Sequence, residues 1–391
     1  MSNPLLHEIR YNPVLWLLVF VPVVFAAEQL KPEAHTALFV LSVLAILPLA
    51  TLLSHATESV AAKTGDAAGG LLNATLGNLT ELVIALTALS AGQYMLVKAS
   101  IAGAIVTNTL FMLGASVLLG GLKHHTQEYN RVSARFQGGL LLLATVALVI
   151  PSAVAQADSA TSAVFIQRLS VGLSVLLLVA YGLGMLFSLG THRELFAGAE
   201  HAQSDETGEA PWPMGLALAT LAGVTVLVAL VSEIFVESVQ EAAETFGMSP
   251  AFVGFIVVAL VGGAAEMASS FSGARKNRLD LSVGIALGSA SQIALFVAPV
   301  LVLASYCIGP TPMDLQFWPG AVVMILIATL TASLVTNSGR SLWFSTTSLF
   351  DATGVNDLST APPSDDNFSF LPLTSSVAFI FLLPSSFTDF A

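Results

Sequence analysis

The stretch Gly77-Asn78-Leu79-Thr80-Glu81 places a glutamate four residues after a glycine, deep inside a long apolar run. A second stretch, Gly262-Gly263-Ala264-Ala265-Glu266, repeats this arrangement in the other half of the chain. Neither glutamate has a lysine or an arginine within its own apolar run. A carboxylate in such a run costs free energy unless it faces the interior of a helix bundle and has a partner there. The two stretches therefore predict a polar centre inside an apolar bundle.

The match between the two halves continues beyond the glutamates. A glycine lies 22 residues after each glutamate, Gly103 in the first half and Gly288 in the second. An amide side chain then follows, Asn108 in the first half and Gln292 in the second. The same order of glycine, carboxylate, glycine and amide at nearly equal spacing predicts an internal duplication.

The composition excludes most other classes of protein. Of the 391 residues, 55% are hydrophobic and 10% are charged, with a mean hydropathy of +0.82. Soluble domains carry about 25% charged residues, so a set of ordinary soluble domains is excluded. With 13 Lys+Arg against 25 Asp+Glu, the chain has no basic surface for nucleic acid. The single cysteine, Cys307, permits neither an internal disulfide nor a cysteine-based metal cluster.

Apolar runs of about 20 residues are long enough to cross a bilayer as helices, and ten such runs are present. They lack the alternation of barrel strands, and only helices or closed barrels satisfy main-chain polar groups in lipid. The chain is therefore predicted to be an all-α polytopic membrane protein. Arg10, ahead of the first run, also fits the start of a secretory signal, which would leave nine spans. The ten runs begin near Val14, Thr36, Gly69, Met95, Phe136, Val171, Met214, Pro250, Leu281 and Phe317.

The positive charges predict the orientation in the membrane, because cytoplasmic loops carry an excess of Lys and Arg. With the N-terminus in the cytoplasm and every charge assigned to a loop, ten of the 13 positive residues are cytoplasmic. These are Arg10, Lys63, Lys123, Arg131, Arg135, Arg193, Arg275, Lys276, Arg278 and Arg340, whereas Lys31, Lys98 and Arg168 fall outside.

Five spans separate the two glutamate-bearing runs, so the two copies cross the membrane in opposite directions. Inverted repeats around a midplane site are typical of secondary transporters, and we expect a transporter rather than an enzyme. The acidic loop between the repeats is interpreted as a solvated linker or as a regulatory, cation-sensing segment. The predicted organisation is an N-terminal tail and leading helix (1–33), a first transmembrane repeat (34–190), the acidic cytoplasmic loop (191–212), a second transmembrane repeat (213–344) and a polar C-terminal tail (345–391).

The predicted ligands are oxygen donors, which favour hard cations such as Ca2+. The seven histidines all lie outside the two glutamate motifs, so a zinc site in the core is not expected. Two carboxylates close together in a low dielectric cannot both stay ionised without a cation, so protons would replace Ca2+ when it leaves. We therefore expect antiport of Ca2+ and protons, without a cofactor. The predicted site comprises Glu81 and Glu266 at its centre, with main-chain or side-chain oxygens from Gly77, Asn78, Asn108, Gly262 and Gln292 in support.

These residues resemble the calcium/proton antiporters of the cation/calcium exchanger superfamily. The resemblance is carried by residues 69–89, 100–119, 261–281 and 284–303, within a family-like context from about residue 45 to residue 343. It implies one leading helix before two inverted repeats of five helices, eleven in all. It also implies that Glu81 and Glu266 are the central Ca2+ ligands.

The resemblance further implies accessory acidic residues on either side of the centre. Glu58 corresponds to a cytoplasm-side acidic region ahead of the first motif, and Glu237, Glu241 and Glu244 to its counterpart ahead of the second. A solvated or capping role is an equal alternative for these four residues.

The chain departs from the family pattern at two places. Gly263 and Met267 stand where the family has Asn and His, which removes one amide oxygen and one titratable ring beside Glu266. Where an eleventh helix is expected, residues 345–391 are rich in Ser, Thr, Pro and Asp. Their one late apolar run, 377–383, is too short to span a bilayer.

Three alternatives to Ca2+/H+ exchange remain from the sequence. Na+- or K+-coupled Ca2+ exchange and antiport of another divalent cation differ from it in their dependence on protons. A cation channel would also line a pore with acidic residues, but it needs no inverted repeat. The expected partners are Ca2+, H+ and the lipid bilayer, with the oligomeric state left open. The expected location is a prokaryotic cytoplasmic (inner) membrane.

Overall fold

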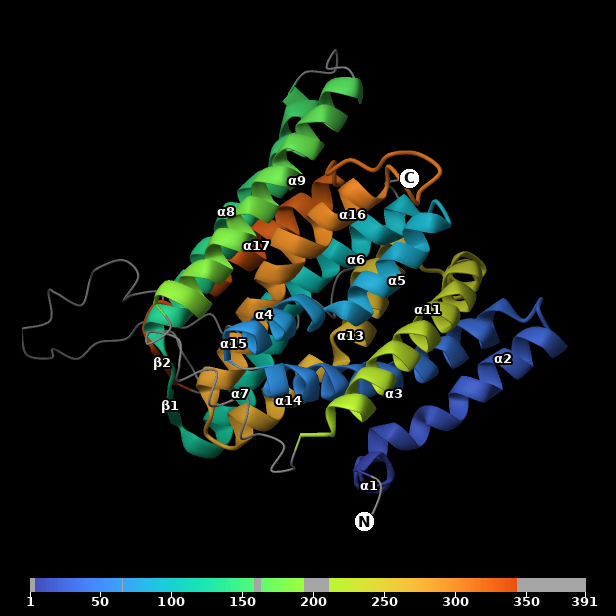
Figure 1. Ribbon diagram of the computed structural model, residues 1–391. Coiled ribbons are helices and arrows are strands. Elements are labelled where there is room, and N and C mark those ends of the chain that lie inside the picture. Colours follow the sequence, from blue (N-terminus) through green and yellow to red (C-terminus); the bar gives the residue numbers. More distant parts are fainter. Residues whose placement is uncertain (1–3, 65, 158–162, 193–210, 343–391) are drawn as a thin grey trace, which may run out of the picture.

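The computed structural model describes residues 4–64, 66–157, 163–192 and 211–342, which form a bundle of long helices (Figure 1). The predicted polar tail, the position expected for an eleventh helix and most of the acidic loop lie outside these residues. The helices of the first half are α1 (Pro4–Tyr11), η1 (Pro13–Val19), α2 (Phe20–Leu30), α3 (His35–Thr64), α4 (Asp66–Leu76), α5 (Leu79–Ser90), α6 (Tyr94–Val106), η2 (Thr107–Met112), α7 (Leu113–His124), α8 (Arg131–Ala157), α9 (Ala163–Met185) and η3 (Leu186–Thr191). Those of the second half are α11 (Met214–Thr245), α12 (Pro250–Phe252), η5 (Val253–Val258), α13 (Ala259–Gly262), α14 (Ala264–Arg275), α15 (Leu279–Gln292), η6 (Ile293–Val297), α16 (Ala298–Ala304) and α17 (Pro319–Val335).

Each of the ten predicted apolar runs coincides with a helix, or with a pair of helices joined at a bend. Among the described residues, seven helices are long and apolar enough to cross a membrane, or nine if each bent pair is one span. The last run corresponds to α17, a shorter apolar helix of 17 residues. The all-helical membrane architecture is therefore confirmed.

The helices extend further than the apolar runs. The prediction that every positively charged residue lies in a loop is therefore wrong. Lys98 lies inside α6, and Arg168 lies inside α9, which begins at Ala163 rather than near Val171. The physical reason is that helical hydrogen bonding continues past the apolar core into its polar margins. α9 has 23 residues and α3 has 30, whereas about 20 cross the hydrocarbon.

Two spans are broken at the glycine motifs. α4 and α5 meet at an angle of 44° across Gly77 and Asn78, and the helix pair that contains α13 and α14 bends by 61° at Gly263. Glycine disfavours a continuous helix, and asparagine favours its beginning. Asn78 precedes α5 as its N-cap with non-helical dihedral angles, and Glu81 lies in the first turn of that helix.

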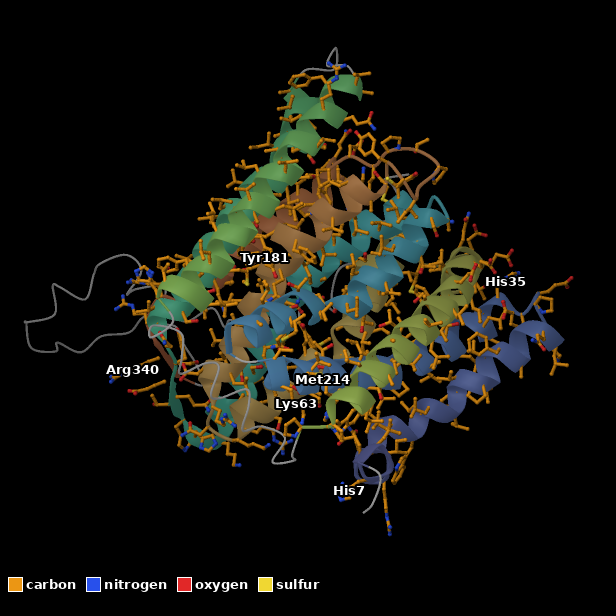
Figure 2. The ribbon with its side chains drawn as sticks, in the orientation of Figure 1. His7, His35, Lys63, Tyr181, Met214 and Arg340 are labelled. Carbon is orange, nitrogen blue, oxygen red and sulfur yellow. The ribbon has the colours of Figure 1, made fainter. Side chains whose placement is uncertain are left out.

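Contacts between loops show which helix ends lie together at each of the two ends of the bundle. At one end, β1 (Thr126–Glu128) pairs antiparallel with β2 (Arg340–Leu342), and Gln127 Nε2 donates to the main-chain oxygen of Ala274 at 2.9 Å. We call this the β1–β2 end. Figure 2 shows Arg340 there, and it shows His35 and Lys63 at opposite ends of α3.

At the opposite end, the segment 305–318 is fastened to the helices of the first half. Lys98 forms an ion pair with Asp314 at 2.5 Å, and the Tyr94 hydroxyl donates to the Thr311 main-chain oxygen. We call this the 305–318 end. The described positive residues divide between the two ends as the charge pattern predicts. Which end faces the cytoplasm stays a prediction.

The two broken spans run in opposite directions between these ends. α5 leads towards the 305–318 end, where a Cβ atom on Gly92, just after the helix, would lie 3.1 Å from Pro310 Cγ. α14 leads to the β1–β2 end, where the Arg275 main-chain oxygen accepts a hydrogen bond from Lys123 Nζ at 3.0 Å. This antiparallel arrangement agrees with the predicted inverted repeat.

Close packing brings the two halves together around the broken spans. A Cβ atom on Gly103 would lie 2.1 Å from the main-chain oxygen of Phe255, so α6 approaches η5 more closely than any side chain permits. α3 and α11 also pack extensively against each other, and the Trp212 main-chain N–H donates to the Ser59 hydroxyl at 3.3 Å. The predicted polar centre lies within this packed interior.

Candidate functional site

Glu81 and Glu266 occupy equivalent positions in the two broken spans. Each lies in the first turn of the helix that follows the break, Glu81 in α5 and Glu266 in α14. The N-terminus of a helix favours negative charge, because its first main-chain N–H groups have no partner within the helix. The Glu81 carboxylate hydrogen bonds with its own main-chain amide. Each residue as a whole is partly exposed, although the Glu266 Oε2 atom is buried.

The two glutamates face a common centre. Their carboxylates are close enough to interact electrostatically. A Cβ atom on Gly262, at the end of α13, would lie 2.9 Å from Glu81 Cγ and 3.2 Å from its Oε1. Glycine at this position therefore lets the carboxylate from one repeat lie against the break in the other. Glu266 Oε2 is buried and has no hydrogen-bond partner among the described residues.

A hydrogen-bonded network joins the predicted amide residues beside the glutamates. Asn78 Nδ2 donates to Gln292 Oε1 at 2.6 Å. Asn108 Nδ2 donates to the Ser289 hydroxyl at 2.8 Å, and that hydroxyl donates to Asn78 Oδ1 at 2.8 Å. The structure thus brings together the three amides that the sequence selected, and it adds Ser289 to them.

Ser289 connects this network to a carboxylate, since its hydroxyl lies within hydrogen-bonding reach of Glu266. The sequence reasoning missed it. Its one sequence signal is that it lies three residues before Gln292 and shares a face of α15 with that residue. A lone serine in an apolar helix is common enough that this signal does not select it.

Gly77 and Gly263 contribute space and main chain instead of side-chain ligands. The Cβ position of Gly77 is 3.9 Å from Gln292 Oε1, and that of Gly263 is 3.7 Å from Asn108 Oδ1. The Met267 methyl group, Cε, lies 3.6 Å from the same Cβ position of Gly263. Met267 is buried and folds back over the glycine, so it occupies space beside the position where a larger residue would project.

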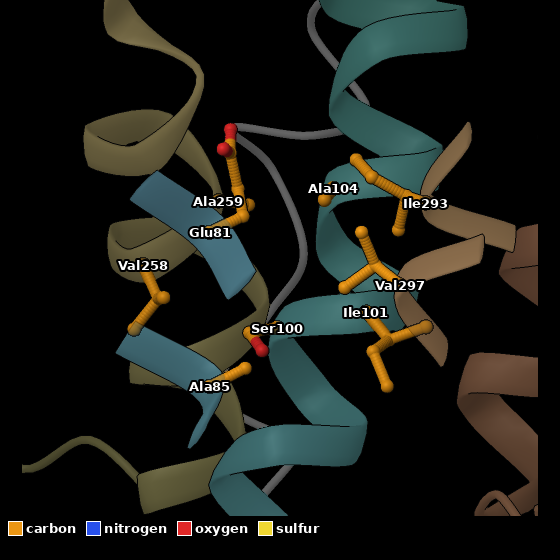
Figure 3. A pocket seen from close by; sticks show the side chains of 9 residues that line it. All are labelled: Glu81, Ala85, Ser100, Ile101, Ala104, Val258, Ala259, Ile293 and Val297. Atoms are coloured by element: carbon orange, nitrogen blue, oxygen red, sulfur yellow. The ribbon is translucent and has the colours of Figure 1, made fainter. Parts of the chain in front are cut away.

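A narrow pocket extends from Glu81 towards the 305–318 end. It encloses about 290 Å3 of empty space between α5, α6, η5, α13 and η6. Figure 3 shows the Glu81 carboxylate at one end of the lining residues, with Ala85 and Ser100 towards the other. Apart from Glu81 and Ser100, the lining side chains are apolar: Ala85, Ile101, Ala104, Val258, Ala259, Ile293 and Val297.

A wider pocket lies on the opposite side of the glutamates, towards the β1–β2 end. It encloses about 700 Å3 of empty space between η1, the second half of α3, and α14. Glu58 lines it and accepts a hydrogen bond from Ser54 at 3.3 Å, and His55 lies beside them. Ala265, the neighbour of Glu266 in the chain, lies in the same wall. Glu58 thus lines the same pocket as Ala265, the neighbour of Glu266 in the chain.

The other three predicted accessory residues are not brought to the centre. Glu237, Glu241 and Glu244 are exposed on the C-terminal part of α11. Glu241 forms an ion pair with His35 at 3.1 Å, which joins α11 to the beginning of α3.

The donor set of the centre is two carboxylates together with amide, hydroxyl and main-chain oxygens. Among the described residues, no group of three or more His, Cys, Asp or Glu side chains is placed to hold a metal ion. Oxygen-only donors suit a hard cation, and Ca2+ takes about six to eight of them. The arrangement offers an ion two charges from two inverted helices, and it leaves those charges next to each other when the ion departs.

Comparison with known proteins agrees with this architecture. The family model described as "Sodium/calcium exchanger protein" matches residues 34–190 and 216–350. A Ca2+/H+ antiporter of Synechocystis sp. is 40% identical over 342 residues, which cover 84% of this chain and 91% of the relative. The Ca2+/H+ antiporter ChaA of Bacillus subtilis is 40% identical over 316 residues, which cover 81% and 89%.

Solved structures show the same fold. The structure of native YfkE superposes with a TM-score of 0.72 at 35% identity, covering 88% of this chain and 98% of that one. The H+/Ca2+ exchanger CAX superposes with a TM-score of 0.64 at 16% identity, covering 94% and 91%, which supports the fold alone. The resemblance carried by the two glutamate motifs is thus confirmed, and the chain belongs to the sodium/calcium exchanger protein family.

Proposed function

We propose that this chain is a secondary active antiporter that exports cytosolic Ca2+ in exchange for protons. The observation that carries the proposal is the pair Glu81 and Glu266, each in the first turn of a broken helix from one of two antiparallel spans. The relatives named as Ca2+/H+ antiporters, at 40% identity, support the same choice of ions.

Ca2+ would bind between the two carboxylates, with Asn78, Asn108 and Gln292 supplying amide oxygens and the breaks at Gly77 and Gly262 supplying main-chain oxygens. In the structure the amide oxygens of Asn78 and Gln292 accept hydrogen bonds within the network. Each amide oxygen has a second lone pair. The network therefore orients these oxygens and leaves one lone pair on each to bind Ca2+.

Protons would leave when Ca2+ arrives and return when it departs. Two adjacent carboxylates without a cation between them repel each other, and protonation removes that repulsion. Because the same two groups bind either Ca2+ or protons, movement of one ion is coupled to movement of the other.

The two pockets supply the routes for alternating access. The wide pocket lined by Glu58 would admit Ca2+ from the cytoplasm, and the narrow pocket beside Glu81 would widen to release it on the other side. In this assignment the β1–β2 end is cytoplasmic, as the charge pattern predicts, in the inner membrane of a prokaryote.

The test is 45Ca2+ uptake into inverted membrane vesicles with an imposed pH gradient. The native chain is expected to accumulate 45Ca2+, and Glu81→Gln and Glu266→Gln are expected to abolish accumulation at normal protein levels. Glu241→Gln is the matched control, because it removes an exposed carboxylate that pairs with His35 away from the centre.

Uptake at the normal rate in either central variant would refute the paired-glutamate site. Uptake by the native chain that requires a Na+ or K+ gradient and ignores the pH gradient would refute proton coupling and support the corresponding exchanger. Flux that follows the Ca2+ gradient alone, and that neither gradient can drive uphill, would support a channel.

A further inference from the structure

Two exposed arginines lie at the start of α8, at the β1–β2 end. Arg131 is the first residue of the helix, and Arg135 lies one turn later on the same face. We call these two residues the arginine pair. No other residue of α8 is charged. Of its 27 residues, the 22 that follow Arg135 are about 33 Å long as a helix, against about 30 Å of hydrocarbon in a bilayer. The arginine pair therefore lies at the depth of the lipid headgroups.

An exposed apolar stripe continues from the arginine pair along the same face of α8. Gly139, Leu142, Leu143 and Val146 are all exposed, and they follow Arg135 at intervals of three or four residues. Figure 1 shows α8 and α9 side by side at one edge of the bundle. From Arg135 to Val146 the stripe is about 16 Å long, and one leaflet contains about 15 Å of hydrocarbon. The stripe therefore matches the acyl chains of one leaflet in length.

The turn after α17 positions the side chains of the arginine pair. Arg135 Nε donates to Asn337 Oδ1, which leaves the N–H groups of the two terminal nitrogens available to a ligand. A Cβ atom on Gly339 would lie 3.1 Å from Arg131 Cβ, so the same turn packs against the other arginine. The Arg131 guanidinium has no hydrogen-bond or ion-pair partner among the described residues. Two guanidinium groups thus lie one turn apart with unoccupied donors.

Neighbouring carboxylates have partners of their own. Glu128 forms an ion pair with Arg340 at 2.9 Å, between β1 and β2. Asp280 accepts a hydrogen bond from the Asn130 main-chain N–H and lines a pocket on the buried side of α8. The exposed face of α8 therefore keeps the positive charge of its two arginines.

The geometry points to a binding site for an anionic phospholipid on this face of α8. The headgroup phosphate accepts hydrogen bonds from the arginine pair, and one acyl chain lies along the stripe from Gly139 to Val146. Arginine suits a phosphate because its planar group offers parallel N–H donors. Phosphatidylcholine suits the site less well, because its quaternary ammonium group brings a third positive charge next to the other two. The site is independent of the ions that the centre exchanges.

The apolar stripe favours a lipid over a soluble phosphate. The acyl chains of a phospholipid occupy the leaflet beside the stripe, so they hold the phosphate at the depth where the uncharged part of α8 begins. A soluble phosphate has no such restraint on its position. The depth of the arginine pair and the stripe next to it therefore select an anion that is anchored in the membrane.

The test is native mass spectrometry of the full chain, purified in an uncharged detergent with equal amounts of phosphatidylglycerol and phosphatidylcholine. The native chain is expected to retain phosphatidylglycerol in preference to phosphatidylcholine. An arginine beside an anionic headgroup contributes about fivefold in affinity. Arg131→Gln should therefore lower retention of phosphatidylglycerol about fivefold, and the double variant with Arg135→Gln about 25-fold.

Lys276→Gln is the matched control, because it removes an exposed positive charge at the same end of the bundle but outside α8. It should leave the retention of both lipids unchanged. Thermal unfolding in detergent without added lipid checks the fold of each variant. Arg131→Gln should unfold like the native chain, since the Arg131 guanidinium has no partner to lose among the described residues and the bond from Arg135 to Asn337 remains.

Retention of phosphatidylglycerol within twofold of the native level in the double variant would overturn the site, and so would an equal loss in Lys276→Gln. Equal retention of the two lipids by the native chain would show that the arginine pair does not select an anionic headgroup. Displacement of phosphatidylglycerol by soluble glycerol phosphate would assign the arginine pair to a soluble anion instead. Dimers of the native chain without bound lipid, absent from the double variant, would show that a second copy covers this face.

Discussion

Replacing Ser289 by alanine tests whether the hydrogen-bonded network organises the cation site. The hydroxyl accepts from Asn108 Nδ2 and donates to Asn78 Oδ1, both at 2.8 Å. All three residues are at least 95% buried, at 4%, 1% and 1% exposure for Ser289, Asn78 and Asn108. Ser289→Ala leaves one amide N–H and one amide oxygen without their partner.

The expected loss of stability follows from these two unpaired groups. A buried polar group that loses its partner costs about 1–3 kcal/mol, so the free energy of unfolding should fall by about 2–6 kcal/mol. Asn78 would also lose the contact that fixes its amide oxygen next to the glutamates. If that orientation is worth about 1.4 kcal/mol, the KM for Ca2+ should rise about tenfold. The maximal rate should stay near normal, because both carboxylates remain.

The assay is pH-gradient-driven 45Ca2+ uptake over a range of Ca2+ concentrations, together with thermal unfolding of the purified protein. Ser174→Ala is the control, since its buried hydroxyl donates to the Ser170 main-chain oxygen at 2.7 Å within α9, away from the site. It should lower stability by less than about 1 kcal/mol and leave KM unchanged. A KM within twofold of normal in Ser289→Ala, with no greater loss of stability than in the control, would show that the network does not organise the site.

Three further predictions concern other parts of the molecule. Gly262→Ala places a Cβ atom 2.9 Å from Glu81 Cγ, and this overpacking should cost about 1–3 kcal/mol and raise the KM for Ca2+ in the uptake assay. Gly263→Asn should reduce uptake, because the new side chain begins 3.6 Å from Met267 Cε, and Gly263→Asn combined with Met267→His should restore it. Burial raises the pKa of Tyr129 above its ordinary value of about 10, so its neutral form stabilises the fold below pH 10 and this contribution is lost as pH rises further. In thermal unfolding, the stability advantage of the native chain over Tyr129→Phe should therefore shrink between pH 9 and pH 11, and a constant advantage would contradict this assignment.

The sequence was informative wherever a residue type is rare in its setting. A glutamate in an apolar run has few structural explanations, so Glu81 and Glu266 could be selected, and their repeated spacing led to Asn108 and Gln292. The structure places all four around one centre. Serine carries no comparable signal, because it is common in apolar helices, and Ser289 was missed for that reason.

Residue types alone could not predict where the spans bend, or which accessory glutamates line a pocket. Glycine is tolerated within membrane helices, so Gly77 and Gly263 do not reveal whether a helix bends there or by how much. Glu58 and Glu241 are both carboxylates near helix ends. Only the packing of α14 beside α3 shows that Glu58 lines a pocket, while Glu241 pairs with His35 on the surface.

The pairing of β1 with β2 has a consequence for how the protein is made. The contact between Tyr129 and Gly339 beside these strands joins residues 210 positions apart, and β2 is the last element of the described chain. During synthesis, β1 emerges with the first repeat and has no strand to pair with until all the described helices have been translated. The β1–β2 contact is therefore among the last to form, and it closes the bundle only after both repeats are in place. A ribosome stalled before Arg340 would hold all the described spans with the β1–β2 pairing not yet formed.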